Sequence, residues 1–323
     1  MTAPLRRLGN TEIHVSAVAM GCWPIAGMTS LAVNDADSLA TLARAVECGI
    51  NFFDTAYCYG ADGESERLLA QAFAEKPEAV VIATKGGIHW GPQGEQVLDG
   101  RPATLRYECD RSLRRLRRGY IDLHYLHAPD PKVPVAESAG AFRELLEVGK
   151  IRAVGVSNLT VEQMEEFHAV CPITACQPPY NMLQRQIERD IVPWCQQHDV
   201  SLAIYWPLMK GLLAGKLARD HEFAAGDGRV KYPMFRGEEW EKNQDFLDQL
   251  RPIAEEVGRP LAQVVVNWTI HQPGITTALC GAKRPWQIEE SAAALDFQLT
   301  LEQFAAIDRA LQARGEAVVR NPV

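Results

Sequence analysis

Polar side chains end most of the short apolar segments of this 323-residue chain. In chain order they are Asp54, Lys85, His127, Ser157 with Asn158, Gln177 and Tyr205. A carboxylate, an ammonium and an imidazole can carry acid–base chemistry if the fold brings them together. Taken alone, Asp54 and Lys85 could equally form a structural ion pair. A reaction centre is therefore a hypothesis that depends on the elements that position these residues.

Eight short apolar runs alternate with longer amphipathic stretches, which is typical of β–α units with a parallel sheet. The predicted strands are Val15–Cys22, Asn51–Ala56, Ala79–Lys85, Ile121–His127, Ala153–Asn158, Thr174–Pro179, Ser201–Leu208 and Thr276–Ala282. The predicted helices between them are Asp37–Cys48, Glu64–Phe73, Thr104–Leu116, Ala136–Val148, Val161–Ala169, Gln184–Gln197 and Gln287–Leu295. Eight repeats predict a closed (β/α)8 TIM barrel, in which the carboxyl ends of all strands open on one rim. The polar residues above should meet at that rim.

The remaining segments complete a single domain over residues 1–323. Leu5–Val15, with Leu8-Gly9-Asn10-Thr11 as its turn, predicts an N-terminal β-hairpin. Extra helices are expected at the C-terminal end. From Lys210 to about Asn243 little helical period is visible, so a long loop is expected, of the kind that forms a lid or a binding element.

Charge and cysteine usage exclude several classes of protein. Forty-one acidic and thirty-three basic residues give a net charge of -8, so the surface repels nucleic acid and anionic membranes. The eight cysteines contain no C-x-x-C pair, which favours reduced thiols in a cytosol. No segment approaches the 18 or so apolar residues that span a bilayer, and no export signal is present. We expect a cytoplasmic protein without nucleic-acid or membrane partners.

His124 and His127 invite a metal hypothesis, which the spacing argues against. Three residues apart on a strand, they point to opposite faces and cannot share one ion. His89 is interpreted as loop surface or pocket wall. We therefore expect no metal site.

The chain resembles the aldo-keto reductases over nearly its whole length. The matching segments are Leu8-Gly9, Asp54 to Gly60, Ala83 to Lys85, Ser112 to Leu116, Ile121 to Leu123 with His127, Gly155 to Asn158, Gln177 to Asn181, Gly211 to Lys216 and Gly281 to Arg284. The segments Pro178 to Asn181 and Gly281 to Arg284 are most similar to bacterial reductases of the general-stress and inositol-cluster type. An NADPH-dependent aldehyde or ketone reductase is the function that this resemblance implies.

The resemblance implies a catalytic tetrad of Asp54, Tyr59, Lys85 and His127. Reduction of a carbonyl places negative charge on its oxygen, so a proton donor must lie within hydrogen-bond reach. Tyr59 would supply the proton, and the Lys85 ammonium, held charged by Asp54, would lower the pKa of the phenol. His127 would orient the substrate oxygen.

The family also implies a cofactor site for NADPH on this chain. The implied contacts are Gly21, Cys22, Trp23, Asp54, Ser157, Asn158, Gln177, Tyr205, Trp206, Pro207, Leu208, Lys210, Gly211, Lys216, Gly281, Lys283, Arg284, Gln287 and Ser291. Ser157, Asn158 and Gln177 would bind the nicotinamide carboxamide, and Tyr205 would stack on the ring. Lys283 and Arg284, beside a helix N-terminus, would bind the 2′-phosphate.

Ordinary interpretations of these cofactor residues stay open. Ser157 and Asn158 could be a helix cap, and Lys283 with Arg284 could be a solvated surface. Ser291 stands where the family usually has Asn, which is a departure from the family pattern at the adenine contact.

Aromatic residues are expected to line the substrate pocket. Trp23, Tyr57, Trp90 and Trp206 would surround the polar tetrad and favour apolar, flat or sugar-derived carbonyl compounds. Two other functions are considered: a cofactor-sensing regulatory subunit with little turnover, and a barrel enzyme using Lys85 for Schiff-base chemistry.

Overall fold

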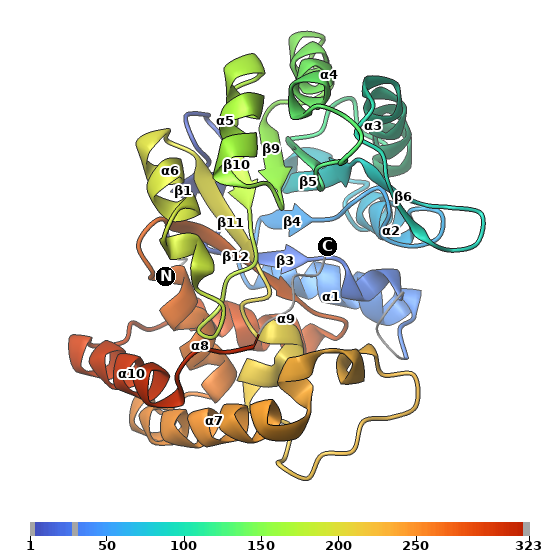
Figure 1. Cartoon of the computed structure of the whole chain (residues 1–323). Helices are drawn as coiled ribbons and strands as arrows, with labels where there is room; N and C mark the ends of the chain where they lie inside the picture. The colour runs from blue at the N-terminus through green and yellow to red at the C-terminus, as the bar shows by residue number, and fades with distance from the viewer. Residues whose placement is uncertain (1–3, 28–31, 319–323) are drawn as a thin grey trace.

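Eight parallel strands form a closed barrel in the computed structural model, which describes residues 4–27 and 32–318 (Figure 1). The strands are β3 (Val18–Gly21), β4 (Phe52–Asp54), β5 (Val81–Gly86), β8 (Leu123–Leu126), β9 (Val154–Ser157), β10 (Ala175–Gln177), β11 (Ser201–Tyr205) and β12 (Ile275–Gly281). They pair in chain order, and β12 closes the barrel against β3. Each lies within or next to one of the eight predicted runs. The predicted (β/α)8 TIM barrel is therefore confirmed.

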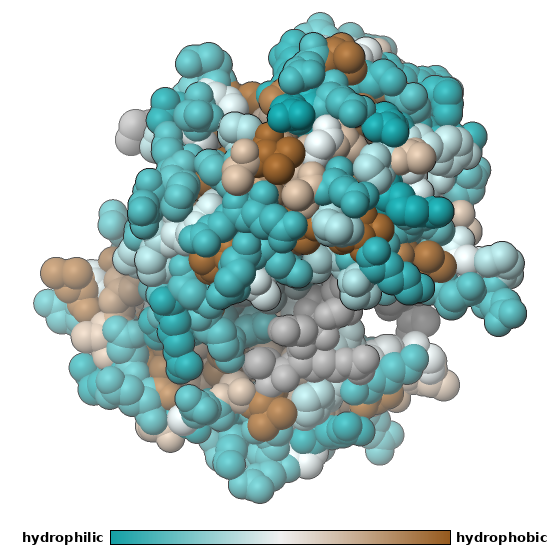
Figure 2. Space-filling model, turned by 45° about the horizontal axis from the view of Figure 1, so that its top comes forward, coloured by the Kyte–Doolittle hydropathy of each residue, from teal (hydrophilic) through white to brown (hydrophobic). Residues whose placement is uncertain are grey.

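Helices surround the barrel on its outer side (Figure 1). They are α1 (Asp35–Glu47), α2 (Glu64–Ala72), α3 (Pro102–Leu116), α4 (Val135–Glu147), α5 (Val161–Val170), α6 (Ile191–Gln197), α7 (Gly237–Val257), α8 (Leu261–Ile270), α9 (Pro285–Ala292) and α10 (Leu301–Arg314). The long helix α7 and the C-terminal helix α10 pack against each other. Figure 2 shows one face of the molecule, on which hydrophilic side chains predominate and hydrophobic ones form small scattered groups.

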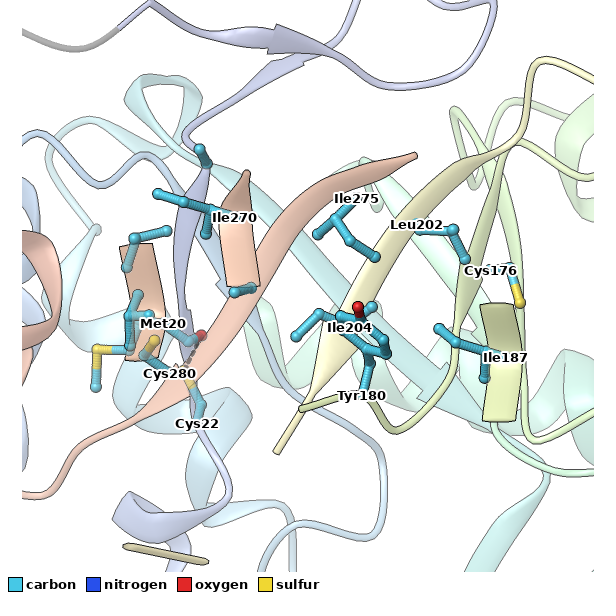
Figure 3. Close-up of a cluster of buried hydrophobic side chains, with 14 of the residues drawn as sticks. Met20, Cys22, Cys176, Tyr180, Ile187, Leu202, Ile204, Ile270, Ile275 and Cys280 are labelled. Atoms are coloured by element: carbon cyan, nitrogen blue, oxygen red, sulfur yellow. Dashed lines mark hydrogen bonds between the residues drawn. The ribbon is translucent and has the colours of Figure 1, made fainter. Parts of the chain in front are cut away.

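Strand alternation divides the core into two layers. On β3, Val18 and Met20 belong to the large cluster between strands and helices, whereas Ala19 faces the barrel interior. Because side chains on a strand alternate between its faces, short apolar strands can fill both layers. Figure 3 shows part of the outer layer, where Met20, Cys22 and Cys280 lie together beside β3 and β12.

The N-terminal hairpin closes the end of the barrel opposite the site. Its strands β1 (Arg6–Arg7) and β2 (His14–Val15) are antiparallel, as predicted. Leu8 and Val15 belong to the same buried cluster as the barrel interior. Arg6 donates to the carbonyls of Ile270 and Ile275, at the start of β12. The hairpin therefore seals the amino ends of the strands.

The predicted loop from Lys210 to Asn243 is wrong in its second part, because α7 begins at Gly237. The segment before it contains short 3-10 turns, η4 (Met209–Ala214), η5 (Gly228–Lys231) and η6 (Pro233–Phe235). In α7, Trp240 and Phe246 are buried, but charged residues lie between them and dilute the helical period.

Two further elements differ from the sequence-based expectation. The predicted helix Gln184–Gln197 is a 3-10 turn, η3 (Gln186–Glu188), followed by the short helix α6. A second hairpin, β6 (Ile88–Trp90) with β7 (Gln96–Leu98), follows β5 and was not predicted. It places Trp90 beside the barrel mouth. No helix in the described part of the chain has the length and apolarity to cross a bilayer.

Candidate active site

Lys85 lies at the centre of a hydrogen-bonded cluster at the carboxyl end of β5. Its ammonium Nζ donates to Asp54 Oδ1 at 2.5 Å, to the Thr55 carbonyl at 2.8 Å and to Tyr59 Oη at 3.3 Å. An ammonium has three hydrogens, so all three are used. The side chains of Lys85 and Asp54 are only 1% and 4% exposed. The phenol oxygen of Tyr59 thus accepts from a buried cation, and its own hydrogen is left for another acceptor.

Asp54 extends the cluster from β4 to β10. Its second oxygen, Oδ2, accepts from Gln177 Nε2 at 2.8 Å. The carboxylate is therefore bonded on both oxygens by side chains from two other strands. Burial raises the pKa of Asp54, and the neighbouring Lys85 and Gln177 oppose that rise.

The network continues around the rim through β9 and β11. Ser157 Oγ donates to the Gln177 carbonyl at 2.8 Å, and Asn158 Nδ2 donates to Ser157 Oγ and to the His127 carbonyl, both at 3.0 Å. Tyr205 Oη donates to Asn158 Oδ1 at 2.9 Å. Asn158 adopts φ +61°, a left-handed conformation that Asn tolerates better than most residues. The carboxyl ends of six strands of the barrel therefore contribute to one connected polar surface.

His127 lies on the other side of Tyr59, at the end of β8. The ring centroids of Tyr59 and His127 are 5.9 Å apart, and the rings are nearly perpendicular. His127 Nδ1 lies 3.7 Å from Cys58 Sγ. His124 points the opposite way and stacks on Phe142 of α4, so the two histidines are on opposite faces of the strand, as predicted.

Burial determines how the site titrates. It raises the pKa of Tyr59 well above its usual range, and the Asp54 charge adds to the rise. It also lowers the pKa of His127 well below its usual range, with help from the Lys85 charge. The lowered tyrosine pKa that the sequence predicted is therefore wrong in this structure, because the Lys85 charge is offset by Asp54 and desolvation dominates. At neutral pH the phenol carries its proton and the imidazole is neutral.

Two of the four predicted aromatic wall residues surround Tyr59. The rings of Trp23 and Tyr59 meet edge to face at 4.8 Å. Trp90, on the hairpin after β5, donates from Nε1 to the Cys58 carbonyl at 2.8 Å. Tyr59, Trp90 and the buried Cys58 share one small hydrophobic cluster.

The other two predicted wall residues pack elsewhere. The ring of Tyr57 lies under the guanidinium of Arg115 on α3, with 4.4 Å from the carbon to the centroid. Trp206 packs against Tyr205 at 5.7 Å and Tyr232 at 5.8 Å, and the Lys210 ammonium lies 4.7 Å from both the Trp206 and the Tyr232 ring centres. Trp206 therefore belongs to the loop after β11 and Tyr57 to the contact with α3.

The cations predicted to bind the cofactor phosphates lie around the start of α9. The Lys283 backbone N–H donates to Gln287 Oε1 at 2.9 Å. Arg284 lies 3.0 Å from Asp37 of α1 and donates to the Ala32 carbonyl at 2.8 Å. Lys216 is half exposed, pairs with Glu290 at 2.7 Å and lies over the ring of Trp286. These groups converge, but each already has a protein partner.

The backbone is closely packed at one end of the predicted cofactor site and adopts left-handed conformations at the other. Gly21 pairs with both Asp54 and Gly281, and a Cβ on Gly281 would lie 3.0 Å from Pro24. After β11, buried Pro207 and half-buried Leu208 precede Lys210 and Gly211, which both have positive φ. These residues shape the rim through their backbone conformation.

Two predicted cofactor residues are turned into the protein. The Cys22 side chain is buried in the outer core and its Sγ hydrogen-bonds the Met20 carbonyl at 3.6 Å (Figure 3). Its backbone N–H donates to the Asp54 carbonyl. Ser291 is 6% exposed and donates to the Gln287 carbonyl within α9. Neither offers a side chain to a ligand at the rim.

The donor set fits a nicotinamide nucleotide. Hydroxyl, amide N–H and amide oxygen groups lie side by side on Ser157, Asn158 and Gln177, and a carboxamide both donates and accepts hydrogen bonds. Cations gather beside the N-terminus of α9, where phosphate groups are stabilised. Metal ligation has no such support: among residues 4–27 and 32–318, no three His, Cys, Asp or Glu side chains are grouped as a metal site requires.

Sequence reasoning missed three contributors to this site. The Thr55 carbonyl accepts from Lys85, Cys58 touches His127, and Asp37 pairs with Arg284. Cys58 directly precedes Tyr59, so its neighbourhood could have been inferred from the sequence. A backbone acceptor and a contact between α1 and α9 have no local sequence signal.

Comparison with known proteins gives concordant matches over the whole chain. The sequence model of the Aldo/keto reductase family matches residues 17–312. The aldo-keto reductase YhdN of Bacillus subtilis (strain 168) is 34% identical over 319 residues, which cover 98% of this chain and 95% of that protein. The NADH-specific methylglyoxal reductase of Escherichia coli (strain K12) is 32% identical over 309 residues, covering 91% of this chain and 94% of the relative.

Two solved structures also match this fold over nearly the whole chain. The glycerol dehydrogenase AKR11B4 from Gluconobacter oxydans superposes with a TM-score of 0.91 at 37% identity, covering 100% of this chain and 99% of that one. The holo form of the aldo-keto reductase AKR11C1 from Bacillus halodurans superposes with a TM-score of 0.80 at 25% identity, over 99% of each chain.

Proposed function

The chain belongs to the aldo/keto reductase family, and on this basis we propose that it reduces aldehydes or ketones to alcohols with NADPH, using Tyr59 as the proton donor. The family assignment confirms the resemblance found in the sequence. The catalytic roles, the coenzyme and the substrate class are the parts proposed here.

The observation that carries the proposal is the complete use of the Lys85 ammonium. Because its three hydrogens go to Asp54, Thr55 and Tyr59, the phenol oxygen is held as an acceptor. The Tyr59 O–H is then available to a carbonyl oxygen at the mouth of the barrel. After the proton leaves, the phenolate faces a buried cation 3.3 Å away, which stabilises it. When bound, a reduced nicotinamide nucleotide supplies the hydride that this proton transfer accompanies.

Because burial raises the pKa of Tyr59, the phenol is protonated at neutral pH. The protonated phenol is the form that carbonyl reduction requires. Oxidation of an alcohol requires the phenolate as a base, so we expect it to gain from alkaline pH. His127, neutral and next to Tyr59, contributes a second polar group for the substrate oxygen.

NADPH is proposed rather than NADH because of the cations at α9. Arg284 and Lys283 precede the helix, and Lys216 lies nearby. The Escherichia coli relative is named as NADH-specific, so family membership does not decide the coenzyme. Asp37 is a carboxylate 3.0 Å from Arg284 and would oppose a phosphate there. To bind the 2′-phosphate of NADPH, Arg284 therefore has to break its ion pair with Asp37.

Small carbonyl compounds are the proposed substrates, held between Trp23 and Trp90 beside Tyr59. The eight cysteines are all free thiols, most of them buried, which supports the proposed cytoplasmic location.

The Tyr59→Phe variant tests the mechanism. We expect a loss of turnover of about 10²- to 10⁴-fold, the usual contribution of a positioned proton donor, with unchanged nucleotide binding measured by fluorescence. Nitrobenzaldehyde, methylglyoxal, short-chain aldehydes and sugar aldehydes, each assayed with NADPH and NADH, define substrate and coenzyme. Near-normal turnover of the variant would remove Tyr59 from the mechanism. Tight nucleotide binding without oxidation by any carbonyl compound would favour the regulatory subunit instead.

A further inference from the structure

Cys58 is a buried thiol in contact with the site that the proposed mechanism does not use. It is 2% exposed and directly precedes Tyr59. Its carbonyl accepts from Trp90 Nε1 at 2.8 Å, and its Sγ lies 3.7 Å from His127 Nδ1. The residue is therefore fixed at its backbone by the β6–β7 hairpin and at its side chain by the end of β8.

The protonation states of Cys58 and His127 determine which of the two donates the hydrogen bond. Burial raises the pKa of the Cys58 thiol to about 12, so sulfur carries its hydrogen at neutral pH. Burial and the Lys85 charge hold His127 neutral, so one ring nitrogen is a donor and the other an acceptor. Sulfur is a weak acceptor, whereas an imidazole nitrogen lone pair is a good one. A hydrogen bond from the S–H group to Nδ1 is therefore favoured over one from an imidazole N–H to sulfur.

We propose that Cys58 is a positioning residue that fixes the neutral tautomer of His127 with its hydrogen on Nε2. His127 then presents an N–H donor on the ring edge facing away from Cys58. The hydrogen bond made by one imidazole nitrogen sets the role of the other, as is common for ligating and catalytic histidines. The main-chain bonds of His127, to Gly86 and from Asn158, hold its backbone, and its ring contacts the Cys58 thiol and the Tyr59 ring.

This tautomer of His127 affects how the substrate oxygen is bound, an inference that rests on the proposed carbonyl reduction. An oxygen accepting the Tyr59 O–H would also accept the His127 N–H, so negative charge forming on it would have two donors. In the other tautomer, a nitrogen lone pair would face that oxygen and repel it. Cys58 therefore acts on substrate affinity and orientation through His127, without touching the reacting atoms.

The tautomer itself is measured without turnover. Protein labelled with 15N-histidine is examined by NMR, and the His127 signals are assigned by their loss in His127→Asn. In the wild type we expect an unprotonated Nδ1 and a protonated Nε2. In Cys58→Val, whose side chain cannot donate, we expect a mixture of tautomers, and Cys58→Ala serves the same purpose if the valine variant does not fold. A wild-type spectrum with protonated Nδ1 would overturn the proposal, even if the protein proves to be an active reductase.

Kinetics provide the second test. One net hydrogen bond corresponds to a loss of about 3- to 10-fold in kcat/KM for the carbonyl compound, with the larger part in KM. Cys58→Ser should restore part of the loss, because a hydroxyl can donate. Cys109→Val, a swap of a buried thiol on α3, is the matched control and should change neither the tautomer nor the kinetics.

A double-mutant comparison separates positioning from packing. In a His127→Asn background, Cys58→Val should have no further effect on kcat/KM. An equal loss in both backgrounds would mean that the thiol acts through packing, and the proposal would fail. If no carbonyl compound is reduced by the wild type, the proposed function fails and the NMR result alone decides the role of Cys58.

Discussion

Replacing Lys85 with Met should destabilise the protein in a way that depends on pH. The variant keeps the volume of the side chain but leaves the Asp54 carboxyl buried without its cation. Removing one partner of a buried ion pair costs about 3–5 kcal/mol in the free energy of unfolding. The side chains of both partners are almost fully buried, so solvent hardly screens their interaction.

The sign of the pH dependence follows from the pKa of Asp54. Burial already raises this pKa in the wild type, and loss of the ammonium raises it further. At a pH above the pKa of Asp54 in the folded wild type, Asp54 is therefore protonated in the folded variant. It is ionised in the unfolded variant and in the folded wild type. The stability of the variant falls as pH rises, and each pH unit in this window adds about 1.4 kcal/mol to its deficit relative to the wild type.

Urea unfolding of the wild type and the variant, at intervals from about pH 5 to about pH 8, measures the deficit. The double variant Asp54→Asn with Lys85→Met removes the carboxyl as well, and its deficit should not change with pH. A deficit of Lys85→Met that stays constant with pH, or an equal slope in the double variant, would refute the reasoning.

Three other predictions follow from single contacts. Arg284→Ala should weaken NADPH binding by about 10- to 100-fold and leave NADH almost unaffected, by fluorescence titration; equal weakening of both would place the 2′-phosphate elsewhere. Burial raises the pKa of Glu108 from 4.5 to about 8, so its contribution to the free energy of unfolding falls as pH rises between these values. Glu108→Gln should remove up to about 1.4 kcal/mol of this fall per pH unit. An unchanged dependence of stability on pH in the variant would contradict the raised pKa of Glu108. Gly155→Ala would place Cβ in contact with the Tyr125 ring and should cost about 1–3 kcal/mol, whereas Gly140→Ala in helix α4 meets nothing within 4 Å and should stabilise the protein by up to about 1 kcal/mol, both measured by thermal unfolding.

The barrel was predictable because its strands carry a strong local signal. Runs such as Val154–Ser157 are short and mostly apolar, and this one is followed by helix α5, which needs only one apolar face. Helix α7 was not recognised because its buried residues, such as Trp240 and Phe246, are separated by many charged ones. The hairpin β6–β7 has strands of three residues, too short for a period to be visible.

The site was predictable as a set of residues but not in its orientations and charges. The sequence placed Asp54 and Lys85 at strand ends, and the closed barrel brings strand ends together. The sequence could not show that Tyr57 turns to Arg115, because that contact joins elements 58 residues apart. It also could not show how much of Tyr59 is buried. The direction of a pKa shift depends on that burial as much as on the charged neighbours.

Closure of the barrel between β12 and β3 has a consequence during synthesis on the ribosome. Thr277 Oγ1 donates to the Ser16 carbonyl at 2.8 Å across 261 residues, and Arg44 pairs with Glu289 at 2.8 Å. Until the last strand emerges, β3 and β11 each expose an unpaired edge that another chain could extend. The barrel can therefore close only after β12, residues 275–281, has left the ribosome.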